Sequence, residues 1–211
     1  MTARNSQWNT VIRKVTEASG GVKRLYQPID HPHFKDWEVT QICSDRLEAV
    51  LKFTGNIKDK RVLDIGCFFG YFSHGLAKLG TRVVGVDISP KKIEVCKLLS
   101  ACYGFPPANP VFYHIGYEDY LKDGGCFDFI LFLSQFHHDL REDTESAWEG
   151  IKLVSEHTDL MFLDMNENVA KRIFSERWDP NLILDHTRFK KLTRLRPSHA
   201  HGRVLYAFEG G

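Results

Sequence analysis

Short β-rich runs alternate with helical patterns from about residue 61 to the end of the chain. Alternation at this pitch is typical of a parallel sheet with helices on both faces, joined by right-handed crossovers. The last two β-rich runs have no helical pattern between them, so we expect them to pair antiparallel at one edge. The runs expected to form the seven strands are 61–65, 82–87, 110–115, 127–134, 159–165, 189–196 and 203–209.

Helical patterns separate most of these runs, and a different kind of sequence precedes them. The stretch LYQPIDHPHFKDW has two prolines and three aromatic side chains, which we interpret as an ordered loop or lid. We therefore expect one α/β domain over 1–211, with an N-terminal helical lid in 1–60 and a Rossmann-like core in 61–211. The expected helices are 44–54, 71–80, 89–104, 143–156 and 168–177.

The first turn from strand to helix in the core, VLDIGCFFGYF, contains two glycines. Gly66 and Gly70 allow the backbone to bend tightly and a ligand to approach it closely. Asp87 ends the next strand, where a carboxylate can accept both hydroxyls of a ribose. The dinucleotide fingerprint fails, because it requires glycine where Phe68 and Tyr71 stand. The pattern D-x-G-x-x-x-G, read here as DIGCFFG and followed by GVDIS, suits S-adenosylmethionine instead.

These two motifs, at this spacing, make residues 61–134 resemble the class I S-adenosylmethionine-dependent methyltransferases. The resemblance implies that Gly66 lies under the methionine part of the methyl donor. It also implies that Asp87 holds the ribose and that Ile88 packs on adenine. Phe68 stands where many members have glycine, so we expect its ring to point away from the donor. The further residues that the resemblance implies at the cofactor are Asp64, Cys67, Gly70, Tyr117, Glu118 and Ser134.

The N-terminal stretch LYQPIDHPHFKDWEVTQICSDRL is similar to one branch of that family. This branch includes the methyltransferase domains of bifunctional kinase–methyltransferases that end O-antigen chains by methylating a terminal phosphate. It implies that Tyr26 and Gln27 close over the donor. It implies that Arg46 pairs with the donor's carboxylate, which a guanidinium fork matches in two bonds. We identify no kinase pattern in these residues, so we expect a separate kinase or glycosyltransferase to supply the acceptor.

Methyl transfer is an in-line displacement from a sulfonium, so the enzyme positions a nucleophile and excludes water. A phosphate acceptor requires only cations to hold it, whereas a hydroxyl or amine benefits from a base such as histidine. His137 and His138 follow the fourth strand and are the candidate bases, and Tyr26 is a further catalytic candidate. Spacing gives Asp139 and Asp164 little weight as metal ligands, and we expect no metal. The candidate acceptor-binding residues are Arg196, His199, His201 and Arg203.

Composition excludes several other classes. The 28 Lys and Arg residues nearly balance 27 Asp and Glu residues, so no strong field favours nucleic acid. No apolar run approaches the roughly 18–20 residues that span a bilayer, and no secretory signal is present. Five scattered cysteines without a CxxC pair indicate neither zinc nor a disulfide framework, and favour the cytoplasm.

The sequence therefore predicts an S-adenosylmethionine-dependent methyltransferase that yields S-adenosylhomocysteine. We expect transfer to oxygen, on a phosphate or sugar of a glycan or related metabolite, as in lipopolysaccharide biosynthesis. Two alternatives stay open. One is a small-molecule O- or N-methyltransferase that uses His137 or His138 as its base. The other is a non-catalytic donor-binding subunit, suggested by Phe68.

Overall fold

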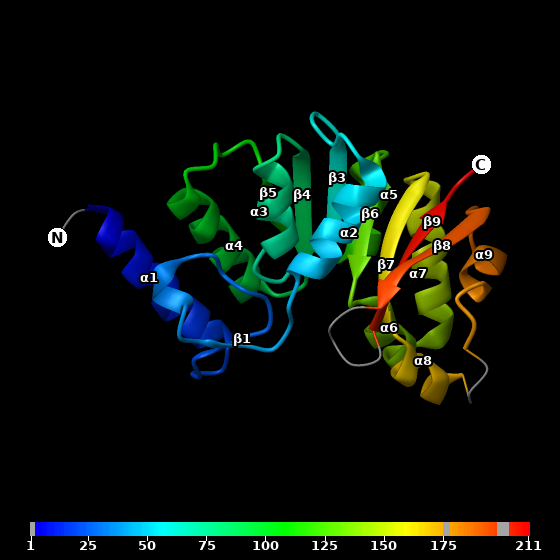
Figure 1. The fold of residues 1–211 in the computed structure, drawn as a ribbon, viewed down its shortest axis with the longest axis horizontal. Coiled ribbons are helices and arrows are strands. Elements are labelled where there is room, and N and C mark those ends of the chain that lie inside the picture. Colours follow the sequence, from blue (N-terminus) through cyan, green and yellow to red (C-terminus); the bar gives the residue numbers. More distant parts are fainter. Residues whose placement is uncertain (1–2, 175–177, 198–202) are drawn as a thin grey trace.

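A computed structural model describes residues 3–174, 178–197 and 203–211 of the chain. Within these residues, seven strands form one sheet in the order β5-β4-β3-β6-β7-β9-β8 (Figure 1). The five strands from β5 to β7 are parallel, and β9 and β8 are antiparallel to their neighbours, as expected. The strands are β3 (Arg61–Ile65), β4 (Arg82–Asp87), β5 (Val111–His114), β6 (Phe129–Leu133), β7 (Leu160–Asn166), β8 (Lys191–Pro197) and β9 (Arg203–Glu209).

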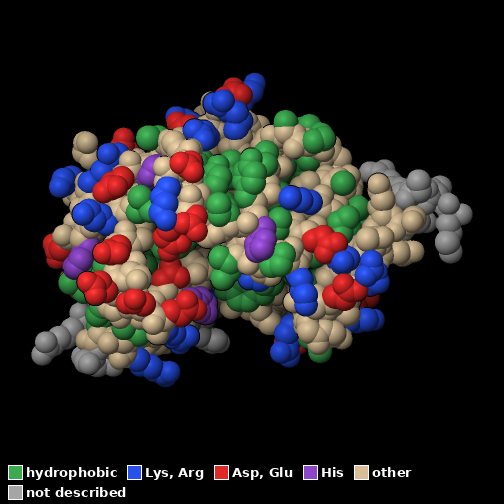
Figure 2. Space-filling view, turned by 180° about the vertical axis from the view of Figure 1, so that it is seen from behind, with side chains coloured by type: hydrophobic (Ala, Val, Ile, Leu, Met, Phe, Trp, Pro, Cys, Tyr) green, Lys and Arg blue, Asp and Glu red, His purple; other side chains and the backbone are tan. Residues whose placement is uncertain are grey.

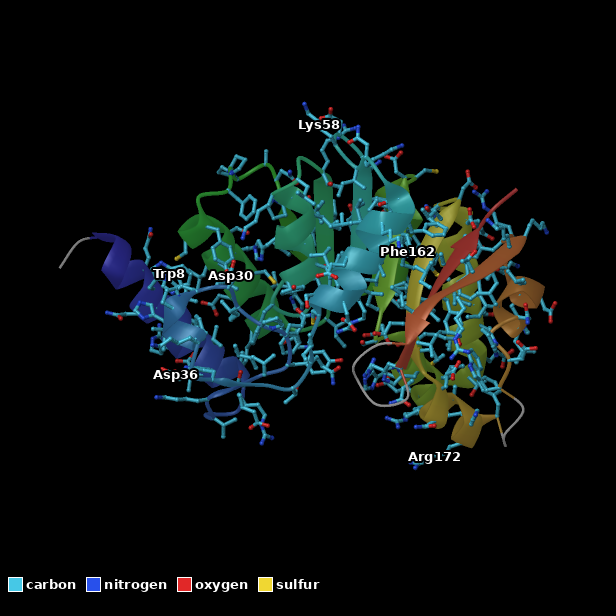
Figure 3. All side chains as sticks on the ribbon, in the orientation of Figure 1. Trp8, Asp30, Asp36, Lys58, Phe162 and Arg172 are labelled. Atoms are coloured by element: carbon cyan, nitrogen blue, oxygen red, sulfur yellow. The ribbon has the colours of Figure 1, made fainter. Side chains whose placement is uncertain are left out.

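Helices cover both faces of this sheet. One face packs against α2 and α3. On this face Phe162 of β7, which is labelled in Figure 3, lies edge-on to Phe53 of α2 and to Phe129 of β6. The other face packs against α5, α6 and α7. The helices of the core are α2 (Ser44–Thr54), α3 (Tyr71–Ala77), α4 (Pro90–Tyr103), α5 (Tyr117–Gly124), α6 (Phe136–Glu142), α7 (Thr144–Glu156), α8 (Glu167–Ile173) and α9 (Leu182–His186).

Local sequence explains where the best-predicted elements begin and end. The Ser89 hydroxyl accepts a hydrogen bond from the Lys92 N–H and Pro90 opens α4, while Gly104 ends it in the left-handed conformation. Asp143 caps α7 in the same manner. The observed bounds of α2, β3, β4 and β9 coincide with the predicted ranges. The predicted helix 168–177 corresponds to α8, and its residues 175–177 lie outside the described part of the chain.

The N-terminal segment forms a layer of its own at one end of the molecule. A long helix, α1 (Ala3–Ala18), packs on α4, and neither its range nor those of α5, α6 and α9 were expected. The ring of Trp8, which is labelled in Figure 3, stacks on the His31 ring at 3.5 Å and ties α1 to the following segment. That segment contains β1 (Arg24–Leu25), a short 3-10 helix (Pro32–Phe34) and β2 (Glu38–Val39). No helix in the described residues has both the length and the apolarity to cross a membrane.

Candidate functional site

A cavity of about 360 Å³ lies where the carboxyl ends of β3, β4 and β6 meet. Parallel strands bring their carboxyl ends to one edge, so residues distant in sequence line one space. The N-terminal segment contributes two of its side chains. The predicted site residues that line this cavity are Tyr26, Gln27, Arg46, Gly66, Asp87, Ile88, Tyr117, Ser134 and His138.

The turn after β3 requires its glycines. Gly66 has φ +65°, and a β-carbon there would lie 3.0 Å from the side-chain oxygen of Gln135. Gly70 has φ +78° and directly precedes α3, and its β-carbon would meet the His74 ring at 2.9 Å. A side chain at either position is strained. The cavity floor at Gly66 is therefore open because no side chain occupies it.

Asp87 presents a fixed carboxylate to the cavity. Its Oδ2 accepts a hydrogen bond from the Phe68 N–H at 3.2 Å, and its Oδ1 accepts one from the Ser89 N–H at 2.9 Å. The Lys92 ammonium lies 3.4 Å from Oδ2. The group is almost fully buried except toward the cavity, and its position suits the predicted ribose contact. The cation Lys92 was not predicted, although it lies one helical turn beyond the Asp87–Ser89 junction.

Phe68 does not point away from the cavity, so that expectation is wrong. Its ring lines the cavity and packs against aromatic neighbours, 5.3 Å from the Tyr26 ring and 4.2 Å from the Phe69 ring. Aromatic pairs at these separations are favourable, which explains the orientation. Phe68 has φ +55°, a conformation uncommon for residues other than glycine. The cavity persists beside the ring, so Phe68 forms a wall and does not fill the site.

The predicted adenine side is built from the starts of α5 and α6. The Tyr117 hydroxyl donates a hydrogen bond to Asp139 at 3.3 Å, and the Gln135 amide donates one to the same carboxyl group at 2.7 Å. Burial raises the pKa of Asp139 to about 6 and also raises the pKa of Tyr117. Glu118 is not among the residues that line the cavity, whereas Gln135 lines it and was missed. The sequence signal that could have identified Gln135 was its position directly after Ser134.

Arg46 reaches the opposite end of the cavity and is almost completely buried. Its Nη1 donates to the Asp164 carboxylate and, at 3.2 Å, to the Ser134 hydroxyl. Its Nη2 lies 3.2 Å from the Cys43 sulfur. Ser134 has φ +60°, so it is the second residue of the site, after Phe68, whose backbone is in the strained left-handed conformation. From the sequence we considered Asp164 only as a weak metal ligand, but in the structure its carboxylate forms an ion pair with Arg46.

The two candidate histidines differ in what they face. His138 lines the cavity, whereas His137 is buried and its Nδ1 has no hydrogen-bond partner in the described residues. Their rings lie 4.3 Å apart. Burial lowers the pKa of His137 to about 3 and also lowers that of His138, so both imidazoles are neutral at pH 7. His138 is therefore the histidine that a bound molecule would meet.

Three residues predicted at the cofactor lie behind the cavity. Asp64 is buried and accepts a hydrogen bond from the Ser73 hydroxyl at 2.6 Å, and burial raises its pKa to about 7. The Cys67 thiol is buried among Ile93, Cys96 and Phe112, while the Cys67 N–H supports the turn through the Val86 carbonyl. Gly70 directly precedes α3. These residues hold the turn in shape and do not line the cavity.

The candidate acceptor residues are only partly described. Arg203 is buried, and its Nη1 donates to the Ser134 hydroxyl at 2.6 Å and to Asp164 at 3.1 Å. Arg196 lies on β8 opposite Leu205. His199 and His201 fall outside the described residues. Within the described residues, no group of His, Cys, Asp and Glu side chains could hold a metal ion.

A second cavity of about 840 Å³ lies behind the N-terminal segment, against α3. It is lined mainly by apolar side chains, including Leu25, Ile29 and Leu47, and by none of the predicted site residues. Size alone would favour this cavity. The conserved geometry of parallel sheets instead favours the smaller one, because it lies at the strand ends and contains fixed polar groups.

The face covered by α5 and α7 carries mixed charges. Figure 2 shows many Asp and Glu side chains over this part of the surface, beside a hydrophobic patch. Ile88 and Tyr113 are among the exposed hydrophobic residues, and Ile88, which is 75% exposed, also lines the smaller cavity. This face is not the continuous basic surface that a phosphate backbone requires.

Comparison with known proteins supports the resemblance seen in the sequence. Residues 62–158 match a family model described as a methyltransferase domain. The chain is 31% identical over 142 residues to the O-antigen chain terminator bifunctional methyltransferase/kinase WbdD of Escherichia coli, covering 62% of this chain and 18% of WbdD. It is 30% identical over 159 residues to the ubiquinone biosynthesis O-methyltransferase of Pseudoalteromonas translucida (strain TAC 125), covering 71% of this chain and 65% of that protein.

A solved structure shares the fold over nearly the whole chain. The crystal structure of WbdD superposes with a TM-score of 0.76 at 23% identity, covering 94% of this chain and 46% of the WbdD chain. The chain thus spans less than half of that solved structure and about a fifth of the WbdD sequence.

Proposed function

Because the chain belongs to the class I S-adenosylmethionine-dependent methyltransferases, we propose that it methylates an oxygen atom of a phosphate or sugar group on a glycan or related metabolite. Its cofactor is S-adenosylmethionine, which supplies the methyl group. The observation that carries the proposal is the smaller cavity, which has a glycine floor at Gly66 and a fixed carboxylate at Asp87.

The residues present fit the donor from one end to the other. Asp87 would accept the ribose hydroxyls, and Ile88 and Tyr117 would enclose adenine. Gly66 would lie under the methionine part, where the missing side chain leaves room. Arg46 would pair with the donor's carboxylate, and its Nε is a buried donor without a partner in the described residues. Tyr26 and Gln27 would cover the donor and exclude water.

The acceptor would approach the methyl group between Tyr26 and His138. A phosphate oxygen is already anionic, so it attacks without a base and requires only donors that hold it in line. The proposed source of those donors is the set of candidate acceptor residues Arg196, His199, His201 and Arg203. Support comes from the sequence similarity to a chain terminator that is both methyltransferase and kinase.

A hydroxyl acceptor is the second candidate, and one observation favours it. His138 lines the cavity with a lowered pKa, so a neutral imidazole is available to take a proton. The ubiquinone biosynthesis O-methyltransferases among the relatives are consistent with transfer to oxygen. In this version His138 would act as the base and no acceptor phosphate would be needed.

We further propose that a kinase or glycosyltransferase supplies the acceptor and that the reaction takes place in the cytoplasm. All five cysteines are free thiols, as suits a reducing compartment.

The test is methyl incorporation from labelled S-adenosylmethionine into matched acceptors. A phosphorylated sugar, the same sugar without phosphate and an amino sugar are compared at equal concentration. The proposal predicts incorporation into oxygen, with the phosphorylated sugar preferred. Incorporation into the amine alone would contradict it, and preference for the free sugar would favour the His138 mechanism.

A further inference from the structure

Asp164 joins three segments that are far apart in the chain. It lies at the carboxyl end of β7, in register with Leu133, and its side chain is completely buried. Arg46 from α2 and Arg203 from the start of β9 both donate to its carboxylate. The Ser134 hydroxyl lies between them and accepts hydrogen bonds from both guanidinium groups, at 3.2 and 2.6 Å.

The charges in this group do not balance. Arg46 and Arg203 are 1% and 8% exposed, and arginine stays protonated in proteins. Among the described residues, Asp164 is the carboxylate that forms ion pairs with both guanidinium groups, while the buried Asp45 carboxylate accepts a hydrogen bond from the Arg46 backbone N–H. Two guanidinium groups therefore share one carboxylate, and Arg46 also keeps an Nε without a partner in the described residues. An uncompensated buried charge is costly, so the group favours an added anion on the side where Arg46 lines the cavity.

Arg203 is not among the residues lining the cavity, but its ion pair with Asp164 determines how much of the Asp164 negative charge offsets Arg46. If Asp164 paired with Arg46 alone, the two charges would cancel and little attraction for a ligand would remain. With Arg203 on the same carboxylate, the excess positive charge remains beside the cavity. The Arg203 Nη2 also lies 3.5 Å from the Tyr26 hydroxyl, so it contacts the segment that covers the donor.

We propose that Arg203 is a positioning residue that offsets Asp164, so that the charge of Arg46 stays available for the carboxylate of the methyl donor. This inference rests on the proposed function, because it takes Arg46 to face that carboxylate. It assigns Arg203 to donor recognition through Asp164 and Tyr26. It also implies that the chain recognises the donor by the carboxylate at the donor's amino-acid end.

The test compares two donors that differ only in the carboxylate. Binding of S-adenosylmethionine and of decarboxylated S-adenosylmethionine to the full chain is measured by calorimetry. The wild type should prefer S-adenosylmethionine by about tenfold or more, since a charge-assisted hydrogen bond is lost with the carboxylate. In Arg203→Gln this preference should fall to about threefold or less, while affinity for the decarboxylated donor stays within about twofold.

A charge-restoring double variant separates this role from a structural one. Asp164→Asn combined with Arg203→Gln returns the group to one net positive charge, so the preference should recover to within about threefold of the wild type. Arg203→Lys should keep most of it. As a matched control, Arg194→Gln removes an exposed arginine from neighbouring β8 and should leave both affinities unchanged.

Other outcomes overturn the inference. Equal loss of both donors in Arg203→Gln, or no recovery in the double variant, would mean that the arginine only supports the fold. If Arg203→Gln does not fold, the same preference for S-adenosylmethionine over the decarboxylated donor is measured in Arg203→Lys and in the double variant, and those values test the inference. If the wild type binds neither nucleoside, the proposed function itself fails. If it binds both equally, only the inference about the carboxylate fails.

Discussion

Gly150 and Tyr117 fit together because position 150 has no side chain: a β-carbon there would lie 2.2 Å from the Tyr117 hydroxyl oxygen. Gly150 lies in the middle of α7, where alanine would ordinarily stabilise the helix by about 0.5–1 kcal/mol. Glycine at position 150 therefore lowers helix propensity but leaves room for Tyr117, which lines the cavity at its predicted adenine end.

Gly150→Ala should destabilise the protein despite the better helix former. Overpacking costs about 1–3 kcal/mol, which exceeds the propensity gain, so the free energy of unfolding should fall by about 1 kcal/mol. Tyr117 would also be displaced, weakening S-adenosylhomocysteine binding. Urea denaturation and calorimetry measure the two effects. Adding Tyr117→Phe should relieve part of the destabilisation, whereas a more stable Gly150→Ala protein would refute the packing argument.

Asp87→Ala should abolish measurable donor binding. Two hydroxyl hydrogen bonds to a charged acceptor would be lost, each worth about 1.5–3 kcal/mol, which together amount to about 100-fold or more. Calorimetry with S-adenosylhomocysteine measures the change. Asp119→Ala, which removes an exposed carboxylate paired with Lys122, is the matched control and should bind normally. Unchanged affinity in Asp87→Ala would remove the ribose assignment.

The strands that were predicted to the residue depended on local sequence, whereas the misplaced Phe68 ring depends on a contact between distant segments. The runs RVLDI and RVVGVD are apolar and bounded by polar or glycine residues, so β3 and β4 could be predicted to the residue. Helix α1 was missed because its sequence is largely polar. Its buried residues Trp8, Val11 and Val15, spaced three and four apart, were a usable signal.

The residues of the site also differ in whether the sequence alone could place them. Gly66 and Ser134 directly follow strands and Asp87 ends one, so topology places them together once the parallel sheet is inferred. The pairing of Asp164 with Arg203 depends on the register between β7 and β9, which no local pattern encodes. The orientation of Phe68 depends on Tyr26 from the N-terminal segment, so family comparison alone misplaced it.

The Asp64 carboxyl should make stability depend on pH. Burial raises its pKa from near 3.8 to about 7, so between these values the folded state holds a proton that the unfolded state has lost. Stability should therefore fall as pH rises through this window, by at most about 1.4 kcal/mol per pH unit. Asp64→Asn should remove this dependence.

Urea denaturation of wild type and Asp64→Asn at pH 5, 6, 7 and 8 tests the point. Buried His74, whose pKa burial lowers to about 4, acts in the opposite direction as pH falls below 6.5. His74 is present in both proteins, so its contribution cancels in their difference. A difference that stays constant over this range would show that Asp64 is ionised in the folded protein.

His138→Gln should distinguish the acceptor chemistries. With a phosphorylated sugar, turnover should stay within a few-fold of the wild type, because no proton has to be removed. With a hydroxyl acceptor, loss of a general base should slow methyl transfer by about 10²–10⁴-fold. His157→Gln, at the end of α7, serves as the control. A hundredfold loss with the phosphorylated sugar would show that His138 acts in the proposed reaction itself.

The most direct test of the donor site is a crystal structure of the chain with S-adenosylhomocysteine. The account predicts both ribose hydroxyls within hydrogen-bond distance of the Asp87 carboxylate, with the thioether over Gly66 and the terminal carboxylate at Arg46. Density for the nucleoside in the larger cavity behind the N-terminal segment, or a smaller cavity that stays empty under saturating ligand, would contradict it.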